Sequence, residues 1–212
     1  MTQPQCVFLV DDDLASRESI DLLLKSVGLP LKSFATAQEF LDQLEPAQQG
    51  CLILDVRMPG MSGLDLQQRL KEQGIDLPII IISGHADVPM TVRAIRNGAL
   101  DLIQKPFNDQ HLLDRIHEGL EENLNRLNRK EQTSEVLQRV KLLTPREREV
   151  LDMVVSGKTN KKIAEELAIS RKTLDIHRSK VLQKMEAESV ADLVRMVLQQ
   201  RCYNMSIGHA YQ

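Results

Sequence analysis

The 212-residue chain lacks tryptophan and has few aromatic residues, four Phe and two Tyr. Proteins that bind single-stranded nucleic acid stack bases on aromatic side chains, so this scarcity disfavours that class. No apolar run reaches the roughly 18 residues that a membrane-spanning helix needs. Residues 1–6 have neither the basic nor the apolar region of a signal peptide. We therefore expect a cytoplasmic protein with no membrane partner.

Cysteine is also scarce. Cys6, Cys51 and Cys202 form an odd and widely spaced set, and the first two stand in apolar runs of strand length. A disulfide framework needs an even, closely spaced set in a secreted chain. The sequence instead predicts buried, reduced thiols.

The charges are unevenly distributed along the chain. Residues 1–120 carry 10 Lys and Arg against 17 Asp and Glu, a net charge of −7. Residues 142–201 carry 12 against 9, a net charge of +3. An acidic first part and a basic second part indicate two domains with different partners.

The first 120 residues alternate between apolar runs and segments with helical spacing. The apolar runs lie at 6–10, 31–34, 51–55, 78–83 and 101–104. The segments with 3–4 spacing lie at 15–27, 36–45, 63–73 and 87–97. Strands without polar alternation are typical of a parallel sheet that helices cover on both faces. The pattern predicts an α/β domain with a doubly wound, five-stranded parallel sheet.

Polar side chains follow most of these runs, where the strands should end. They are Asp11, Asp12 and Asp13 after the first run, Asp55 at the end of the third, Ser83 at the end of the fourth and Lys105 after the fifth. Open parallel sheets bind ligands at the carboxyl ends of their strands. The sequence thus predicts a site made of carboxylates, a hydroxyl and an ammonium group.

A further helix begins near residue 108, and leucines recur at helical spacing as far as Leu127. No proline occurs between 107 and 144. Two interpretations stay open for 121–139. The helix either continues and pairs with a partner as a coiled coil, or it ends and a flexible linker follows.

The second part of the chain has the pattern of a small helical domain. Thr144, Pro145 and Glu147 form a helix start with a capping box, and the helix stops at Gly157. Three more helices follow, and only a few residues around 168–170 separate the second from the third, as in a helix-turn-helix. The third helix carries five cationic residues against one acidic residue. Such a face favours double-stranded DNA as the partner.

Several stretches together resemble a two-component response regulator of the FixJ/NarL group. They are "LVDDD", "LDVRMPGMSG", "IIISGHADVPMTVRAIRNGALDLIQKPF" and "LTPREREVLDMVVSGKTNKKIAEELAISRKTLDIHRSKV". The resemblance implies a receiver domain over 5–120 and a LuxR-type helix-turn-helix domain over 140–201. It does not extend to 121–139, which we expect to be a helical linker, or to the tail over 202–212.

The resemblance also implies roles for the residues at the strand ends. Asp55 would accept a phosphoryl group from a sensor histidine kinase. Mg²⁺ would be held by Asp11, Asp12, Asp55 and the backbone carbonyl of Arg57. Lys105, ahead of a cis-proline, and Ser83 would bind phosphoryl oxygens. Asp13 is expected to cap the first helix instead.

The chain departs from the family pattern at Leu102. Family members usually carry an aromatic residue there, and its ring turns inward when the Ser83 position moves. Leu102 has no ring. Ser83 and Leu102 are still expected to form the switch region, but by a different repacking.

The residues expected at the DNA are Asn160, Lys161, Arg171, Lys172, Asp175, Arg178, Lys180 and Lys184. A homodimer is expected on phosphorylation, through the face formed by 87–97 and 101–104. The last helix is a second candidate surface, with Val190, Leu193, Val194 and Val197.

Two other functions remain open. The nucleophile, metal site and lysine would also suit a magnesium-dependent aspartyl-phosphate hydrolase. The receiver-like part could alternatively serve only assembly, in a constitutive DNA-binding protein. We favour the regulator, which is not an enzyme, because a DNA-binding domain follows an intact acceptor site.

Overall fold

The computed structural model describes residues 5–45 and 48–210, with side chains as far as Tyr203. The chain divides into two compact units, one ending at Arg126 and the other starting at Leu127. The first unit contains β1 (Cys6–Val10), α1 (Leu14–Ser26), β2 (Leu31–Phe34), α2 (Ala37–Asp42), β3 (Gly50–Asp55), α3 (Gly63–Glu72), β4 (Ile79–Ser83), α4 (Val88–Arg96), β5 (Asp101–Gln104) and the part of α5 (Asp109–Lys141) that ends at Arg126. The second contains the rest of α5, α6 (Pro145–Val155), α7 (Asn160–Glu166), α8 (Arg171–Met185) and α9 (Val190–Ala210).

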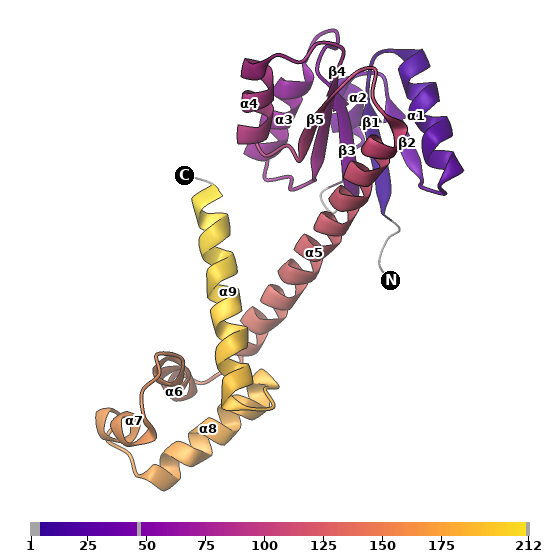
Figure 1. Ribbon diagram of the computed structural model, residues 1–212. Helices are drawn as coiled ribbons and strands as arrows, with labels where there is room; N and C mark the ends of the chain where they lie inside the picture. Colours follow the sequence, from indigo (N-terminus) through magenta and orange to yellow (C-terminus); the bar gives the residue numbers. More distant parts are fainter. Residues whose placement is uncertain (1–4, 46–47, 211–212) are drawn as a thin grey trace. The chain divides into compact units, whose positions relative to one another are not determined.

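The first unit is a five-stranded parallel sheet in the order β2-β1-β3-β4-β5, which confirms the predicted fold class (Figure 1). Successive side chains of a strand point to opposite faces. Val7 and Leu9 accordingly enter one core, and Phe8 and Val10 enter the other. Because both faces are buried, the strands had to be apolar throughout, as the sequence indicated.

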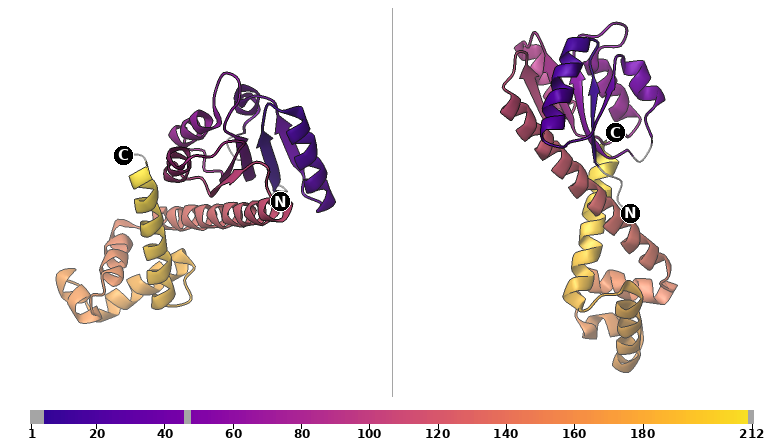
Figure 2. Two further views of the ribbon diagram at one scale, coloured as in Figure 1. Left: turned by 45° about the horizontal axis from the view of Figure 1, so that its top comes forward. Right: turned by 90° about the vertical axis from the view of Figure 1, so that its right-hand side faces the viewer.

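Helices cover both faces of the sheet (Figure 2). On one side α1 and α5 pack through Ile20, Leu24, Leu112 and Ile116. On the other side lie α2, α3 and α4. Asp13 caps α1 as expected, and its carboxylate accepts the N–H of Ala15.

α5 packs very closely on the centre of the sheet. A Cβ on Gly119 would lie 2.6 Å from Sγ of Cys51, so only glycine fits there. One turn later, the buried Asn123 amide oxygen accepts the N–H of Gly50 at the start of β3. Burial raises the pKa of the Cys51 thiol to about 12, so this cysteine stays a protonated core residue. Cys202 differs from the expected buried thiols because it is exposed.

The second unit is built on two apolar clusters. Val150, Ile163, Leu167 and Leu174 hold α6, α7 and α8 together. The other cluster joins α6, α8, α9 and the last turns of α5, and includes Val136. The capping box of Thr144 and Glu147 is present at the start of α6.

Two segments outside the resembling domains are helical. α5 runs unbroken from Asp109 to Lys141, so 121–139 is helix rather than flexible linker. α9 continues to Ala210, so most of the expected tail is helical, and 211–212 lie outside the described residues. No helix within the described ranges is both long enough and apolar enough to cross a bilayer.

Candidate phosphoacceptor site and nucleic-acid interface

Three of the predicted residues meet at the carboxyl edge of the sheet. Lys105, after β5, places its Nζ 2.7 Å from Oδ2 of Asp11 and 2.9 Å from Oδ1 of Asp55. Asp11 and Asp55 are buried, and Lys105 is half-buried. Its peptide bond to Pro106 is cis, as expected. The lysine therefore bridges two carboxylates that would otherwise repel each other.

The environment of the Asp55 carboxyl raises its pKa above the ordinary value. Burial raises its pKa, and the hydrogen bond and charge of Lys105 only partly oppose this rise. For Lys105, burial alone would lower the pKa, but its hydrogen bonds to Asp11 and Asp55 raise it above the ordinary value of 10.5. Lys105 thus remains a cation beside Asp55.

Backbone and side-chain donors fix the two carboxylates. The N–H of Arg57 donates to Oδ2 of Asp55 at 2.6 Å. The hydroxyl of Ser16 donates to Oδ2 of Asp11 at 2.7 Å, and Arg17 donates to the Asp11 carbonyl. Sequence reasoning missed Ser16 and Arg17, because only the first turn of α1 brings them back to the end of β1.

The predicted magnesium ligands are only partly brought together. Asp11 and Asp55 reach the same ammonium group, so one cation can contact both. Asp12 is exposed, and across residues 5–45 and 48–210 no three His, Cys, Asp or Glu side chains form a shared metal cluster. Mg²⁺ often takes only one or two protein carboxylates, with water and phosphate oxygens as its other ligands. The Asp11–Asp55 pair fits that kind of site.

Ser83 lies at the same edge, but its hydroxyl is turned into its own loop. Oγ donates to the carbonyl of His85 at 2.8 Å and accepts the N–H of His85 at 3.2 Å. Ser83 is buried at the end of β4. The hydroxyl is therefore tied to the start of the loop that leads into α4.

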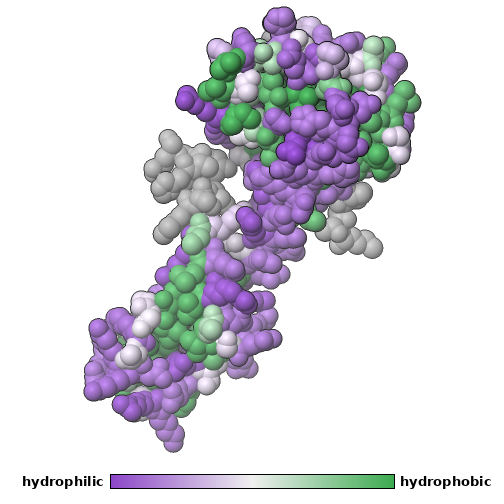
Figure 3. All heavy atoms as spheres, viewed as in Figure 1, coloured by the Kyte–Doolittle hydropathy of each residue, from purple (hydrophilic) through white to green (hydrophobic). Residues whose placement is uncertain are grey.

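α4 has an exposed apolar face. Val88, Val92 and Ile95 are 76%, 42% and 46% exposed. They recur at helical spacing and so lie along one side of α4. Figure 3 shows hydrophobic atoms on the surface where α4 lies in Figure 1. Leu102 stands where the resembling family usually has an aromatic residue. It is half-buried against the core beneath α4.

The second unit has the geometry of a helix-turn-helix. α7 and α8 are joined by residues 167–170, and Ala168 adopts a left-handed φ of 53° in the turn. On α8, Arg171, Lys172, Asp175 and Lys180 are exposed and Arg178 is half-buried. None of the four cations has a carboxylate within 4.0 Å among the described residues. Unpaired cations on an exposed helix suit a phosphate backbone.

Comparison with known proteins agrees with this architecture. Residues 7–117 match the response regulator receiver domain, and residues 141–197 match the bacterial regulatory proteins of the luxR family. The chain belongs to the response regulators with a LuxR-type DNA-binding domain.

Its relatives span the same two domains. Nodulation protein W of Bradyrhizobium diazoefficiens is 44% identical over 90% of this chain and 84% of its own length. The transcriptional regulatory protein FixJ of the same organism is 39% identical over 93% of this chain and 97% of its own length.

Solved structures support the same assignment. The response regulator StyR has a TM-score of 0.81 at 43% identity, covering 93% of this chain and all of that one. Full-length FixJ from B. japonicum has a TM-score of 0.58 at 38% identity, covering 95% of this chain and 99% of that one.

Lys184 has a partner inside the DNA-binding domain of this response regulator. Its Nζ lies 2.6 Å from Oε2 of Glu147 and 3.2 Å from the carbonyl of Leu142. The lysine thus ties α8 to the start of α6. The sequence could not separate it from the free cations of α8, because Glu147 is 37 residues away in the chain.

The apolar residues of α9 divide into two sets. Leu193 and Val197 are buried in the core of the second unit, so they are not free to form a dimer. This corrects the expectation that they belong to a dimer surface. Val190 and Val194 are half-buried, and Leu198 is exposed. Helix spacing alone did not indicate that the last turns of α5 would pack on α9.

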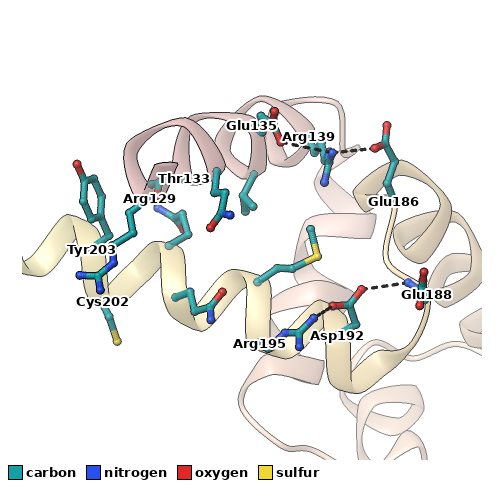
Figure 4. Close-up of a pocket in the computed structure, with 15 residues that line it drawn as sticks. Arg129, Thr133, Glu135, Arg139, Glu186, Glu188, Asp192, Arg195, Cys202 and Tyr203 are labelled. Atoms are coloured by element: carbon teal, nitrogen blue, oxygen red, sulfur yellow. Dashed lines mark hydrogen bonds and ion pairs between the residues drawn. The ribbon is translucent and has the colours of Figure 1, made fainter. Parts of the chain in front are cut away.

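A groove of about 1020 Å³ lies between the last turns of α5 and α9 (Figure 4). Its charges are largely paired with one another. Arg139 lies 2.8 Å from Glu186, and Arg195 lies 2.6 Å from Asp192. The groove therefore has the character of a solvated interhelical surface, unlike the carboxylate site of the receiver domain.

Proposed function

We propose that this response regulator accepts a phosphoryl group on Asp55 from a sensor histidine kinase. The supporting observation is the pairing of Lys105 with both Asp11 and Asp55. A carboxylate oxygen of Asp55 forms the bond to phosphorus as the bond from phosphorus to the kinase imidazole breaks. The electron pair stays on the imidazole nitrogen, which takes up a proton.

Receiver domains of this family typically use Mg²⁺. In this chain Asp11 and Asp55 would hold the ion, with Asp12 and the carbonyl of Arg57 as the further predicted ligands. The bound ion would offset the charge of the incoming phosphoryl group. Lys105 already supplies one positive charge there, and its raised pKa keeps that charge at neutral pH.

Phosphorylation would change the contacts of Ser83. A phosphoryl group adds about −1.5 to −2 charges, by analogy with hydroxyl phosphates. Its oxygens are stronger acceptors than the His85 carbonyl that the Ser83 hydroxyl now contacts. We infer that the hydroxyl moves to the phosphoryl group and takes the loop before α4 with it. Leu102 would repack beneath α4.

The moving face is our candidate for the dimer interface. α4 presents Val88, Val92 and Ile95, which a second copy can bury. Two helix-turn-helix modules on one DNA site roughly double the contacts of a single module. Phosphorylation would therefore control promoter binding through dimerisation.

The DNA partner is a double-stranded promoter, so we place the protein in the cytoplasm. We propose that Arg171, Lys172, Asp175, Arg178 and Lys180 face the DNA. Asn160 and Lys161, exposed in the first turn of α7, would contact phosphates. Lys184 would act within the domain instead. A DNA-binding domain after the acceptor site favours this role over a hydrolase.

Light scattering with and without phosphodonor and Mg²⁺ tests this proposal. We expect a monomer that becomes a dimer on phosphorylation, and we expect Val92→Asp to stay monomeric while its Asp55 is still labelled. Leu22→Asp, at an exposed position on α1, is the matched control and should dimerise. A dimer in both states would point to the rival surface along α5, where Leu124 is exposed. A monomer in both states, at concentrations that bind DNA, would contradict any dimer mechanism.

A further inference from the structure

A glutamine is buried beneath α4. Gln67 on α3 is 1% exposed and packs amid the apolar core on that side of the sheet. Its Nε2 donates to the carbonyl of Ala94 at 3.0 Å. Its Oε1 is buried and has no hydrogen-bond partner among the described residues. A buried amide that is only half satisfied is costly, so a purely structural role does not explain it.

α4 has few other attachments. Ala94 is its only fully buried residue among those described, and the side chain of an alanine contributes little packing. The second polar tie between the helices joins Arg93 to Asp65 at 3.0 Å, and both side chains are more than half exposed. Exposed pairs of this kind contribute little. The Gln67 hydrogen bond is thus the main polar contact that fixes α4 against α3.

α3 is itself fixed to the acceptor strand. The N–H of Gly63, its first residue, donates to the carbonyl of Val56 at 3.0 Å. A Cβ on Gly63 would lie 2.1 Å from the carbonyl oxygen of Asp55, so α3 starts directly against the acceptor residue. Gln67 stands one turn further along the same helix. α3 is therefore held in a fixed position relative to Asp55, and α4 packs against it.

We propose that Gln67 is a positioning residue that latches α4 in its unphosphorylated position through the carbonyl of Ala94. This inference rests on the proposed function and deepens it, because it names what holds the switch helix in a chain whose Leu102 lacks a ring. A shift of α4 that leaves Gln67 buried would remove the partner of Nε2, so neither amide atom would then have one. Phosphorylation has to overcome that cost, and the missing partner of Oε1 keeps the latch weak enough to release.

The test follows the Ile95 methyl signal by NMR in the full-length protein. Ile95 lies on α4, and its signal in wild type with and without phosphodonor and Mg²⁺ defines the two positions of the helix. Gln67→Met keeps the length of the side chain and removes the amide. Gln68→Met is the matched control, because the Gln68 amide bonds only to Glu72 on its own helix at 2.8 Å. If Gln67→Met does not fold, Gln67→Leu takes its place.

Loss of one neutral hydrogen bond should shift the two-position equilibrium roughly two- to tenfold. The signal of unphosphorylated Gln67→Met should therefore move along the line from the unphosphorylated to the phosphorylated position. The signal of Gln68→Met should stay in place. A Gln67→Met signal that stays at the wild-type position, or moves away from the phosphorylated one, would overturn the latch. If wild type itself shows no shift while Asp55 is labelled, then the α4 switch of the proposed function is wrong.

Discussion

Glu147 offers a quantitative test of the DNA-binding domain. The residue is 3% exposed, and its carboxylate accepts hydrogen bonds from Nζ of Lys184 at 2.6 Å and from the N–H of Thr144 at 2.9 Å. The hydrogen bond from Lys184, followed by that from Thr144, lowers the pKa of Glu147 from 4.5 to about 2. A shift of that size corresponds to roughly 3 kcal/mol of favourable interaction with the charged form.

The loss of stability caused by Glu147→Gln should be smaller than the free energy that corresponds to the pKa shift. Lys184 is 34% exposed, so water can replace part of its interaction with Glu147. The glutamine carbonyl can still accept the Thr144 N–H. We therefore expect the free energy of unfolding of the second unit to fall by about 2 kcal/mol at pH 7.

The direction of the pKa shift determines how the stabilisation by Glu147 depends on pH. The folded-state pKa lies below the unfolded one, so the stabilisation is full above about pH 5 and disappears as the pH falls towards 2. Hydrogen exchange of α6 peptides in rising urea measures the unfolding of this unit in the full-length protein. Glu149→Gln is the control, because Glu149 pairs with Arg146 at the surface. A Glu147→Gln deficit that is equal at pH 3 and pH 7, or no larger than that of Glu149→Gln, would refute the reasoning.

Two further predictions concern Asp55 and the DNA. Burial raises the pKa of Asp55, so its ionised form costs stability at neutral pH. This cost decreases as the pH falls through the folded-state pKa and is gone below the unfolded-state pKa. Urea unfolding at pH 7 should thus find Asp55→Asn at least as stable as wild type; a loss above about 1 kcal/mol would contradict this. Lys172→Ala should reduce the salt slope of duplex binding by about 1. Arg195→Ala, whose guanidinium pairs with Asp192, should leave the slope unchanged.

The parts of the fold that depend on local sequence could be predicted. Apolar runs without alternation required a parallel sheet, and parallel strands bring their carboxyl ends to one edge. That reasoning placed Asp11, Asp55 and Lys105 together without any structure. The caps at Asp13 and Thr144 were equally readable, because a cap depends on residues within one turn.

Contacts between distant segments could not be read in the same way. The side of α9 that is buried depends on the last turns of α5, some 60 residues earlier in the chain, so Leu193 and Val197 were assigned wrongly. The direction of the Ser83 hydroxyl depends on the loop geometry at His85. Gln67 gave no signal, because a glutamine on an amphipathic helix usually faces solvent.

The most direct test of the account is phosphoryl labelling of the full-length protein with a small phosphodonor and Mg²⁺. We predict acid-labile, hydroxylamine-sensitive label in wild type and in Asp65→Asn, which removes an exposed carboxylate from α3. We predict no label in Asp55→Asn. Label of similar extent in Asp55→Asn, carried by Asp12 or Asp13, would contradict the assignment of Asp55 as the phosphoacceptor.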